Sequence, residues 1–146
     1  MATREKEEFS ITEAKRYYAN AKETIKNAKK ADEFYNDSKY VKGAGSYLWL
    51  SVLIALDTVY NVKYSKGKSR VTFLDYKNAL AEDKNKNKSL DKNIVKVFEN
   101  AYAIIHLSMS YDGISVVSAC NLGFDYAKQI IDFCEKQNNK RVKTTV

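Results

Sequence analysis

Few side chains in this 146-residue sequence are suited to chemistry. A histidine is the group best suited to move a proton near neutral pH, and His106 is the only one. Asn100 lies six residues before it on the same expected helix, and Asp57 follows an apolar run elsewhere in the chain. We take these three as candidate catalytic residues and assign none of them a role. The sequence contains no Ser/His/Asp order, glycine-rich nucleotide loop or metal cluster that would indicate another enzyme class.

Both ionisable candidates have a structural alternative. Isoleucines precede His106 and a leucine follows it, which is typical of a hydrogen-bonded core or interface residue. An unpaired buried carboxylate is expensive. Asp57 is therefore expected either to reach solvent or to pair with a tyrosine hydroxyl, a lysine or His106.

The two cysteines indicate neither a disulfide nor a metal site. Cys120 and Cys134 are 14 residues apart on one expected helix, a separation of about 21 Å that exceeds disulfide reach. They lie nearly on one face and suit small core positions. With one histidine and no CxxC pattern there is no zinc motif, so we expect no metal and no cofactor. Reduced thiols favour a cytoplasmic location.

A net charge of +7 favours an acidic partner, nucleic acid first, with simple solubility as the alternative. Two basic segments, 63–70 and 84–92, predict weak RNA binding that falls with salt, although such segments are also common as solvated linkers. The candidate nucleic-acid-binding residues are Lys63, Lys66, Lys68, Arg70, Lys84, Lys86 and Lys88. The polar face of the first expected helix is either a solvated face or a basic strip for phosphates, with Lys15, Arg16, Lys22, Lys26, Lys29 and Lys30.

Composition predicts an all-α protein. The chain has no proline and only five glycines, so little forces a break in long helices. We expect a flexible N-terminus over 1–10, a single helical-bundle domain over 11–137 and a disordered basic tail over 138–146. The charged N-terminus does not resemble a signal peptide. The longest uncharged stretch, 43–56, is 14 residues, shorter than the roughly 20 that a membrane span needs, so we expect no membrane partner.

Apolar spacing predicts an up-and-down bundle of four long helices plus one short helix. The first helix has an apolar stripe of Ile11, Ala14, Tyr18, Ala21, Ile25 and Ala28, and a capping box of Ser10 and Glu13. A polar connection over 32–40 leads to a second helix over 39–64. Its segment Leu48–Leu56 is apolar on nearly all sides, so this helix should be central.

The remaining elements follow from the same patterns. We expect a short third helix over 72–83 and a mobile polar loop over 84–89. Ser89 should cap the fourth helix, whose apolar stripe is Leu90, Ile94, Val97, Phe98, Ala101, Ile105 and Ser108. A fifth helix spans 115–137. Gly45 and Gly123 suggest close contacts between helices.

This pattern resembles the HEPN superfamily of helical bundles. Ala14–Ala21 resembles the first helix of that superfamily, Gly45–Asp57 its second helix, and Asn100–Gly113 the region of its signature, an arginine, four to six intervening residues and then a histidine. The resemblance implies a dimer in which the histidine and arginine of the ribonuclease branch cut RNA without metal. His106 matches the histidine, which handles the 2′-hydroxyl proton.

The arginine of that signature has no counterpart here. Asn100 and Ala101 occupy its places, and an asparagine brings no cation to a phosphate. We therefore expect a non-catalytic helical-bundle module, a homodimer through a face that includes part of the fourth helix, engaging a protein or nucleic acid. The alternative is a metal-independent HEPN-type ribonuclease that uses His106 in a dimer cleft.

Overall fold

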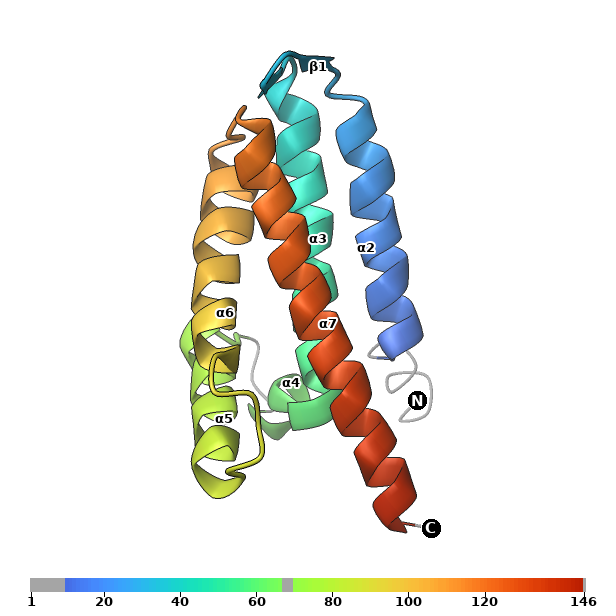
Figure 1. Ribbon diagram of the computed structural model, residues 1–146, viewed down its shortest axis with the longest axis vertical. Coiled ribbons are helices and arrows are strands. Elements are labelled where there is room, and N and C mark those ends of the chain that lie inside the picture. Colours follow the sequence, from blue (N-terminus) through green and yellow to red (C-terminus); the bar gives the residue numbers. More distant parts are fainter. Residues whose placement is uncertain (1–9, 67–69, 146) are drawn as a thin grey trace.

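The computed structural model describes residues 10–66 and 70–145 and confirms an all-α helical bundle (Figure 1). Within that part, the two short strands of one hairpin are the only β-strands, and the rest is helix or loop. The elements in chain order are α2 (Ile11–Lys26), β1 (Lys30–Ala31), β2 (Phe34–Tyr35), α3 (Ser38–Tyr60), α4 (Val62–Lys66), α5 (Phe73–Lys86), α6 (Ile94–Ala101), the π-helix η1 (Tyr102–Tyr111) and α7 (Val117–Thr145). The helix α7 crosses in front of α3, while α5 and α6 lie side by side.

The first helix, α2, follows the predicted pattern. Ala14, Ala21 and Ile25 are buried, and the Ser10 hydroxyl accepts a hydrogen bond from Glu13 N at 3.0 Å. Only half of the predicted capping box forms, because the Glu13 carboxylate accepts from Arg16 instead. The Ser10 cap alone satisfies one of the free amides of the first turn.

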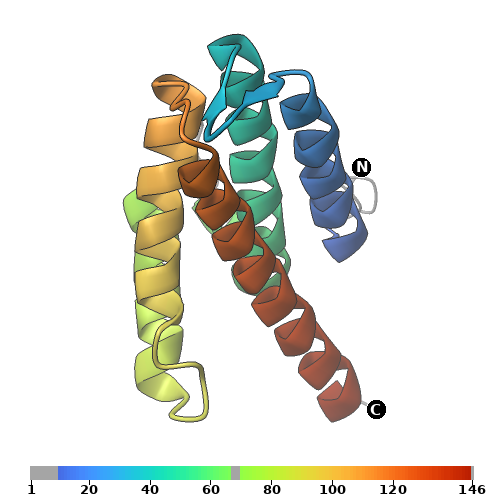
Figure 2. The same cartoon turned by 45° about the horizontal axis from the view of Figure 1, so that its top comes forward.

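The predicted polar connection contains an antiparallel hairpin, which lies at one end of the bundle (Figure 2). Lys29 and Asp32 have positive φ angles of 54° and 57°, so the chain reverses within a few residues. The hairpin is bound to the start of α7: Tyr35 N donates to Ser115 O at 2.7 Å, and Val117 N donates to Glu33 O at 2.9 Å. This contact fixes the hairpin between α2 and α7.

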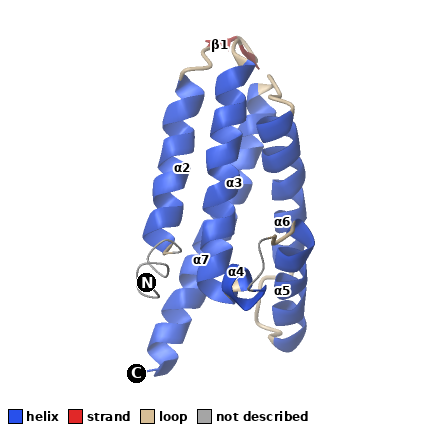
Figure 3. Cartoon of the chain, turned by 180° about the vertical axis from the view of Figure 1, so that it is seen from behind, coloured by secondary structure: helices blue, strands red, loops and turns tan. Residues whose placement is uncertain are grey.

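The helix α3 has the apolar composition of a central helix. It ends at Tyr60 rather than at residue 64, because Asn61 adopts a left-handed conformation with φ of 55°. The prediction that its middle is buried on every side is wrong at two positions: Leu50 is 45% exposed and Leu53 is half-buried. Seen from behind, the upper half of α3 lies in front of α7 with no other described helix over it (Figure 3). Its length and composition would also suffice to cross a membrane, but most of that stretch is buried in the bundle.

The fourth helix begins later than predicted and changes its winding. It starts at Ile94, and Ser89 does not cap it, because both its backbone amide and its hydroxyl bond to Asn87 Oδ1. From Tyr102 the helix continues as a wider π-helix, at whose end Asp112 N donates to Leu107 O five residues back. The predicted stripe is correct as far as Ile105, but the next buried residue is Met109 rather than Ser108.

The shift to Met109 has a geometric cause. The buried positions Ala101, Ile105 and Met109 have a constant spacing of four. On an α-helix such a stripe drifts by about 40° per turn. A π turn holds more residues than an α turn, so it opposes the drift and keeps the stripe facing the core.

Met109 of η1 lies where α3 and α7 both approach closely. These are the two close helix contacts that Gly45 and Gly123 predicted. A Cβ on Gly45 of α3 would lie 2.8 Å from Met109 Cβ and 2.6 Å from Ser110 N. A Cβ on Gly123 of α7 would lie 2.9 Å from Met109 Sδ. Glycine at both positions therefore lets α3 and α7 pack directly on η1.

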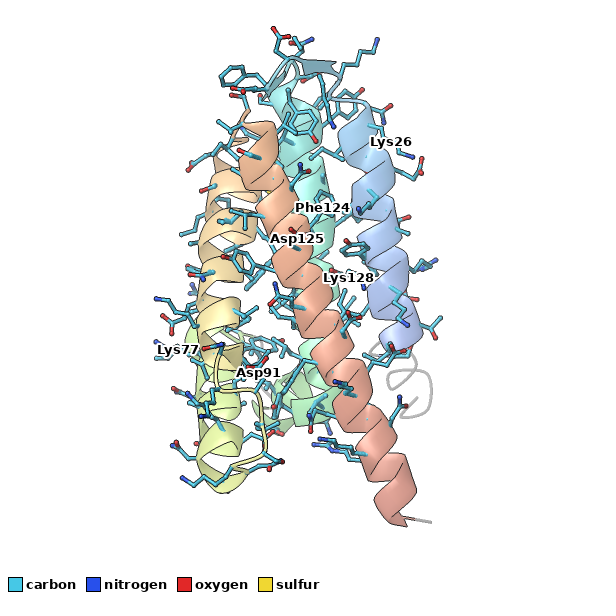
Figure 4. The ribbon with its side chains drawn as sticks, in the orientation of Figure 1. Lys26, Lys77, Asp91, Phe124, Asp125 and Lys128 are labelled. Atoms are coloured by element: carbon cyan, nitrogen blue, oxygen red, sulfur yellow. The ribbon has the colours of Figure 1, made fainter. Side chains whose placement is uncertain are left out.

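Two segments expected to be irregular are helical. The helix α5 continues to Lys86 through the first half of the predicted loop, and an ion pair of 3.9 Å between Lys77, labelled in Figure 4, and Glu99 joins it to α6. The helix α7 does not end at residue 137 but continues to Thr145 through the predicted disordered tail. Asn138 Nδ2 donates to Thr58 Oγ1 at 2.8 Å, so the start of that tail is attached to α3. The predicted flexible segment 1–10 lies outside the described residues except for Ser10.

Candidate functional site: an aromatic groove at His106

His106 lies on a groove of about 460 Å³ between α3, η1 and the beginning of α5. Trp49 and Leu53 contribute from α3, and Tyr102 and Tyr111 contribute from η1. The third wall is the segment 70–76, which brings Arg70, Val71, Thr72, Phe73, Leu74 and Tyr76 to the groove. None of the described residues that line it is acidic. We call this site the aromatic groove.

Rings in the groove contact one another in a continuous series. Phe73 lies on Tyr102, with 4.1 Å between the ring centroids and 30° between the planes. Tyr102 contacts His106 at 5.5 Å and His106 contacts Tyr111 at 4.7 Å, both as tilted pairs. Trp49 stacks on the imidazole from the core side at 5.3 Å. The series of rings thus runs from the core to Tyr111, which is 63% exposed.

Local structure explains why Phe73 is held in this position. The Asp75 carboxylate accepts hydrogen bonds from Thr72 N at 2.9 Å and from the Thr72 hydroxyl at 3.2 Å. These bonds fix the first turn of α5 around Phe73. The ring of Phe73 then packs on Phe98 of α6 at 5.1 Å, so α5 attaches to the bundle through aromatic contacts.

The imidazole of His106 is half-buried and held by ring contacts. Neither of its nitrogens has a hydrogen bond to another described residue, so the expected hydrogen-bonded core histidine is not what the structure contains. Burial lowers the pKa of His106, because the charged form is poorly solvated there. The ring is therefore favoured in its neutral form at neutral pH, in which it can accept a proton.

Asp57 is directed to the back of the groove rather than to His106. It is 3% exposed, and its Oδ2 accepts from the Tyr76 hydroxyl at 3.0 Å while its Oδ1 accepts from Lys63 N at 3.2 Å. Burial raises the pKa of Asp57, and these two hydrogen bonds oppose that rise. Of the predicted partners, a tyrosine hydroxyl is confirmed and a lysine contributes through the charge and backbone amide of Lys63, whereas solvent and His106 are not partners among the described contacts.

Asn100 does not share the site with His106. Its Nδ2 lies 3.5 Å from the Tyr126 hydroxyl on α7, at the limit of a hydrogen bond. His106, by contrast, faces Trp49 on α3. The two residues therefore point toward different neighbouring helices and cannot act on one substrate atom together.

Of the basic candidates, only Arg70 is placed at the aromatic groove. Lys63 is exposed and contributes its backbone amide to Asp57. Lys68 and the side chain of Lys66 lie outside the described part of the chain. Lys84, Lys86 and Lys88 lie at the far end of α5, a helix of 14 residues that spans roughly 20 Å. Among the described residues, Lys84, Lys86 and Lys88 thus do not share a patch with Arg70.

The cysteines and acids offer no second reactive centre. Cys120 and Cys134 are both buried and free, as predicted, and burial raises the pKa of Cys120 to about 11. Among the described residues, no group of three His, Cys, Asp or Glu side chains lies close enough together to hold a metal ion.

Sequence reasoning missed most of the groove. Neither Trp49, Phe73 nor Tyr102 stood out, because aromatic residues at helical spacing are equally typical of a core. Only the exposure of Tyr111 and Leu74 in the fold distinguishes this cluster from the rest of the core.

The fold and groove define a helical bundle with one open aromatic surface. The family described as "Domain of unknown function (DUF5618)" matches residues 9–136, and the chain belongs to this family. It is also similar to the solved structure of a protein of unknown function from Dyadobacter fermentans, with a TM-score of 0.76 and 40% sequence identity over 87% of this chain and 94% of that chain. No curated protein matches it. Function must therefore be argued from the groove.

Proposed function

We propose that this protein is a non-catalytic binding module, homodimeric, whose aromatic groove holds single-stranded nucleic acid. The observation that carries the proposal is the series of ring contacts from Phe73 through Tyr102 and His106 to Tyr111, which is exposed at its Tyr111 end. An exposed ring accepts any base by stacking, and such rings are the usual platform for single strands. A protein partner remains the other outcome of the test below.

Charge at the groove agrees with such a ligand. Arg70 supplies a cation at the rim, no described lining residue is acidic, and the chain has a net charge of +7. A guanidinium can bind a phosphate with two parallel hydrogen bonds while the neighbouring rings hold the base. The groove has a volume of about 460 Å³, which is large enough for roughly one nucleotide.

A binding role fits the groove better than catalysis does. Asn100 is directed to α7, and Asp57 is occupied by Tyr76 and Lys63. His106 is therefore the one described lining residue of a type that exchanges a proton near neutral pH. In the HEPN signature the arginine precedes the histidine on one helix, whereas Arg70 comes from the segment before α5. The groove therefore has a cation for a phosphate but does not reproduce the arrangement of the signature.

The test is fluorescence anisotropy with a labelled single-stranded RNA and DNA. Tyr111→Ala should weaken binding by about 1–3 kcal/mol, the usual loss when one stacking ring is removed. Tyr47→Ala is the matched control. Tyr47 is also an exposed tyrosine, on α3, but it does not line the groove. Arg70→Gln should reduce both the affinity and its salt dependence more than Lys84→Gln does. Equal losses in all four variants, or no binding at low salt, would contradict the proposal and favour a protein partner.

One observation supports the ribonuclease as a second candidate. Arg70 and His106 line the same groove, so a cation missing from the fourth helix is supplied by another segment. The HEPN resemblance would then extend to its chemistry, with Arg70 stabilising the phosphate charge. Cleavage of RNA in excess EDTA, lost in both His106→Ala and Arg70→Gln, would promote this candidate over the binding module.

A further inference from the structure

We propose that a second groove, between α2, the hairpin and α7, binds a small phosphorylated compound with an aromatic or apolar part. This site, which we call the lysine groove, shares no lining residue with the aromatic groove. Its volume of about 350 Å³ lies within the usual range for small-molecule sites. Figure 4 labels two of its residues on facing helices, Lys26 on α2 and Phe124 on α7.

Positive charge converges on this groove, whose described lining contains no acid. Lys22 and Lys26 line it from α2, Lys30 lines it from β1, and none of its described lining residues is a carboxylate. The Lys26 ammonium lies 3.1 Å from Glu23, but both side chains are largely exposed. Such a pair contributes little, so an anion in the groove can displace it.

A buried tyrosine offers a further donor. Tyr35 is only 8% exposed and lines the groove, and its hydroxyl has no hydrogen bond to another described residue. No buried polar atom among the described side chains is left unsatisfied, so this hydroxyl reaches the open space of the groove. Burial raises the pKa of Tyr35, which keeps the phenol protonated and able to donate to an anion. The Tyr35 backbone is fixed by its 2.7 Å bond to Ser115 O.

The rest of the lining fits the organic part of the ligand. Ile25 and Phe124 provide an apolar wall, and Asn121 adds an amide beside it. The Lys22 ammonium lies 5.2 Å from the centre of the Phe124 ring. It can therefore contact a phosphate, while an apolar part of the ligand meets the small accessible parts of Phe124 and Ile25, which are 5% and 8% exposed. Together these residues favour a phosphomonoester on a ring over a bare anion.

Titration of the full chain by ¹H–¹⁵N NMR with phenyl phosphate tests the proposal. We expect saturable shifts at Lys22, Lys30, Tyr35 and Asn121, and weaker binding of inorganic phosphate and of phenol. Lys30→Gln and Tyr35→Phe should each raise Kd by about tenfold, the loss expected of a hydrogen bond to a charged group. Lys29→Gln is the matched control, because it removes the same charge from an exposed neighbour that does not line the groove.

Several results would overturn the proposal. One is an equal loss of affinity for phenyl phosphate in Lys29→Gln and Lys30→Gln. Another is binding of phenol or inorganic phosphate as tight as that of phenyl phosphate. A third is no saturation at millimolar phenyl phosphate. A short RNA and vesicles containing phosphatidic acid form the other arms of the titration. If either displaces phenyl phosphate and its binding is lost in Lys30→Gln and Tyr35→Phe, the phosphate belongs to a polymer or a lipid and the small-ligand proposal fails.

Discussion

The Tyr76 hydroxyl donates a hydrogen bond of 3.0 Å to the Asp57 carboxylate, and both residues are almost fully buried. This bond joins α5 to the end of α3 behind the aromatic groove. It also keeps a buried carboxylate satisfied together with Lys63 N. Burial raises the pKa of both Asp57 and Tyr76, and the nearby Asp57 charge raises that of Tyr76 further.

Removal of this hydroxyl should therefore be costly. Tyr76→Phe leaves the Asp57 carboxylate with one fewer donor, and we expect a loss of about 1.5–3 kcal/mol in the free energy of unfolding. Tyr60→Phe is the matched control, because the Tyr60 hydroxyl donates at 2.7 Å to the less buried Asp83. Urea denaturation of both variants measures the difference. A larger loss of unfolding free energy in Tyr60→Phe than in Tyr76→Phe would contradict the expected greater contribution of the Tyr76–Asp57 bond.

The raised pKa of Asp57 predicts a specific pH dependence. The folded state holds the Asp57 proton more tightly than the unfolded state, so stability falls as pH rises from the ordinary value of 3.8 to the raised folded pKa. Asp57→Asn removes the charge and keeps an acceptor oxygen. The free energy of unfolding of the variant minus that of the wild type should therefore increase with pH across this window and then level off. A difference that is constant from pH 4 to 8, or that falls, would contradict it.

These two residues also show how far sequence alone can go. Because an unpaired buried carboxylate is costly, the sequence predicted a partner for Asp57. A tyrosine hydroxyl was correctly among the candidates, but the sequence has several tyrosines and does not select one. Choosing Tyr76 requires the position of α5, which depends on stacking between Phe73, Phe98 and Tyr102. Apolar spacing does not encode which rings meet.

The fourth helix shows a second limit. Its apolar stripe predicts the buried face correctly through Ile105, because local spacing determines which side of a helix is apolar. The helix changes to π winding from Tyr102, and Met109 is buried in place of Ser108 where Gly45 and Gly123 of two other helices approach it. The glycines were recognisable as contact points, but their common target was not.

The contact at Gly45 gives a third prediction. A methyl group there would meet backbone and Cβ atoms of η1 at 2.6 and 2.8 Å, neither of which can move independently. Gly45→Ala should therefore destabilise the fold by about 1–3 kcal/mol or more, despite the higher helix propensity of alanine. Gly43→Ala, two residues earlier on α3, would place its methyl 3.3 Å from Thr24 Cγ2 on a side chain. It should be nearly neutral or stabilising in thermal melts. Equal destabilisation by both substitutions would argue against close packing at Gly45.

The homodimer predicted from sequence now has a surface that can be tested. Ser46 Oγ of α3 and Ser110 Oγ of η1 are hydrogen-bonded at 2.9 Å, so the outer sides of these two helices form one surface. Leu50 lies on α3 one turn after Ser46 and one turn before Leu53 of the aromatic groove. A dimer through this surface would place two grooves next to each other, as a shared binding cleft requires. Stable interfaces bury at least about 1,000 Å² in total, so Leu50 would be enclosed within it.

A pair of equally exposed leucines distinguishes this surface from any other. Leu50 on α3 and Leu122 on α7 are each 45% exposed. Leu50→Lys should convert the dimer to a monomer, because a charge desolvated inside an interface has no partner, whereas Leu122→Lys should leave it intact. Light scattering coupled to size exclusion at tens of micromolar protein measures the mass of each variant. A monomeric wild type rules the dimer out, and dissociation by Leu122→Lys alone moves the interface to α7, away from His106.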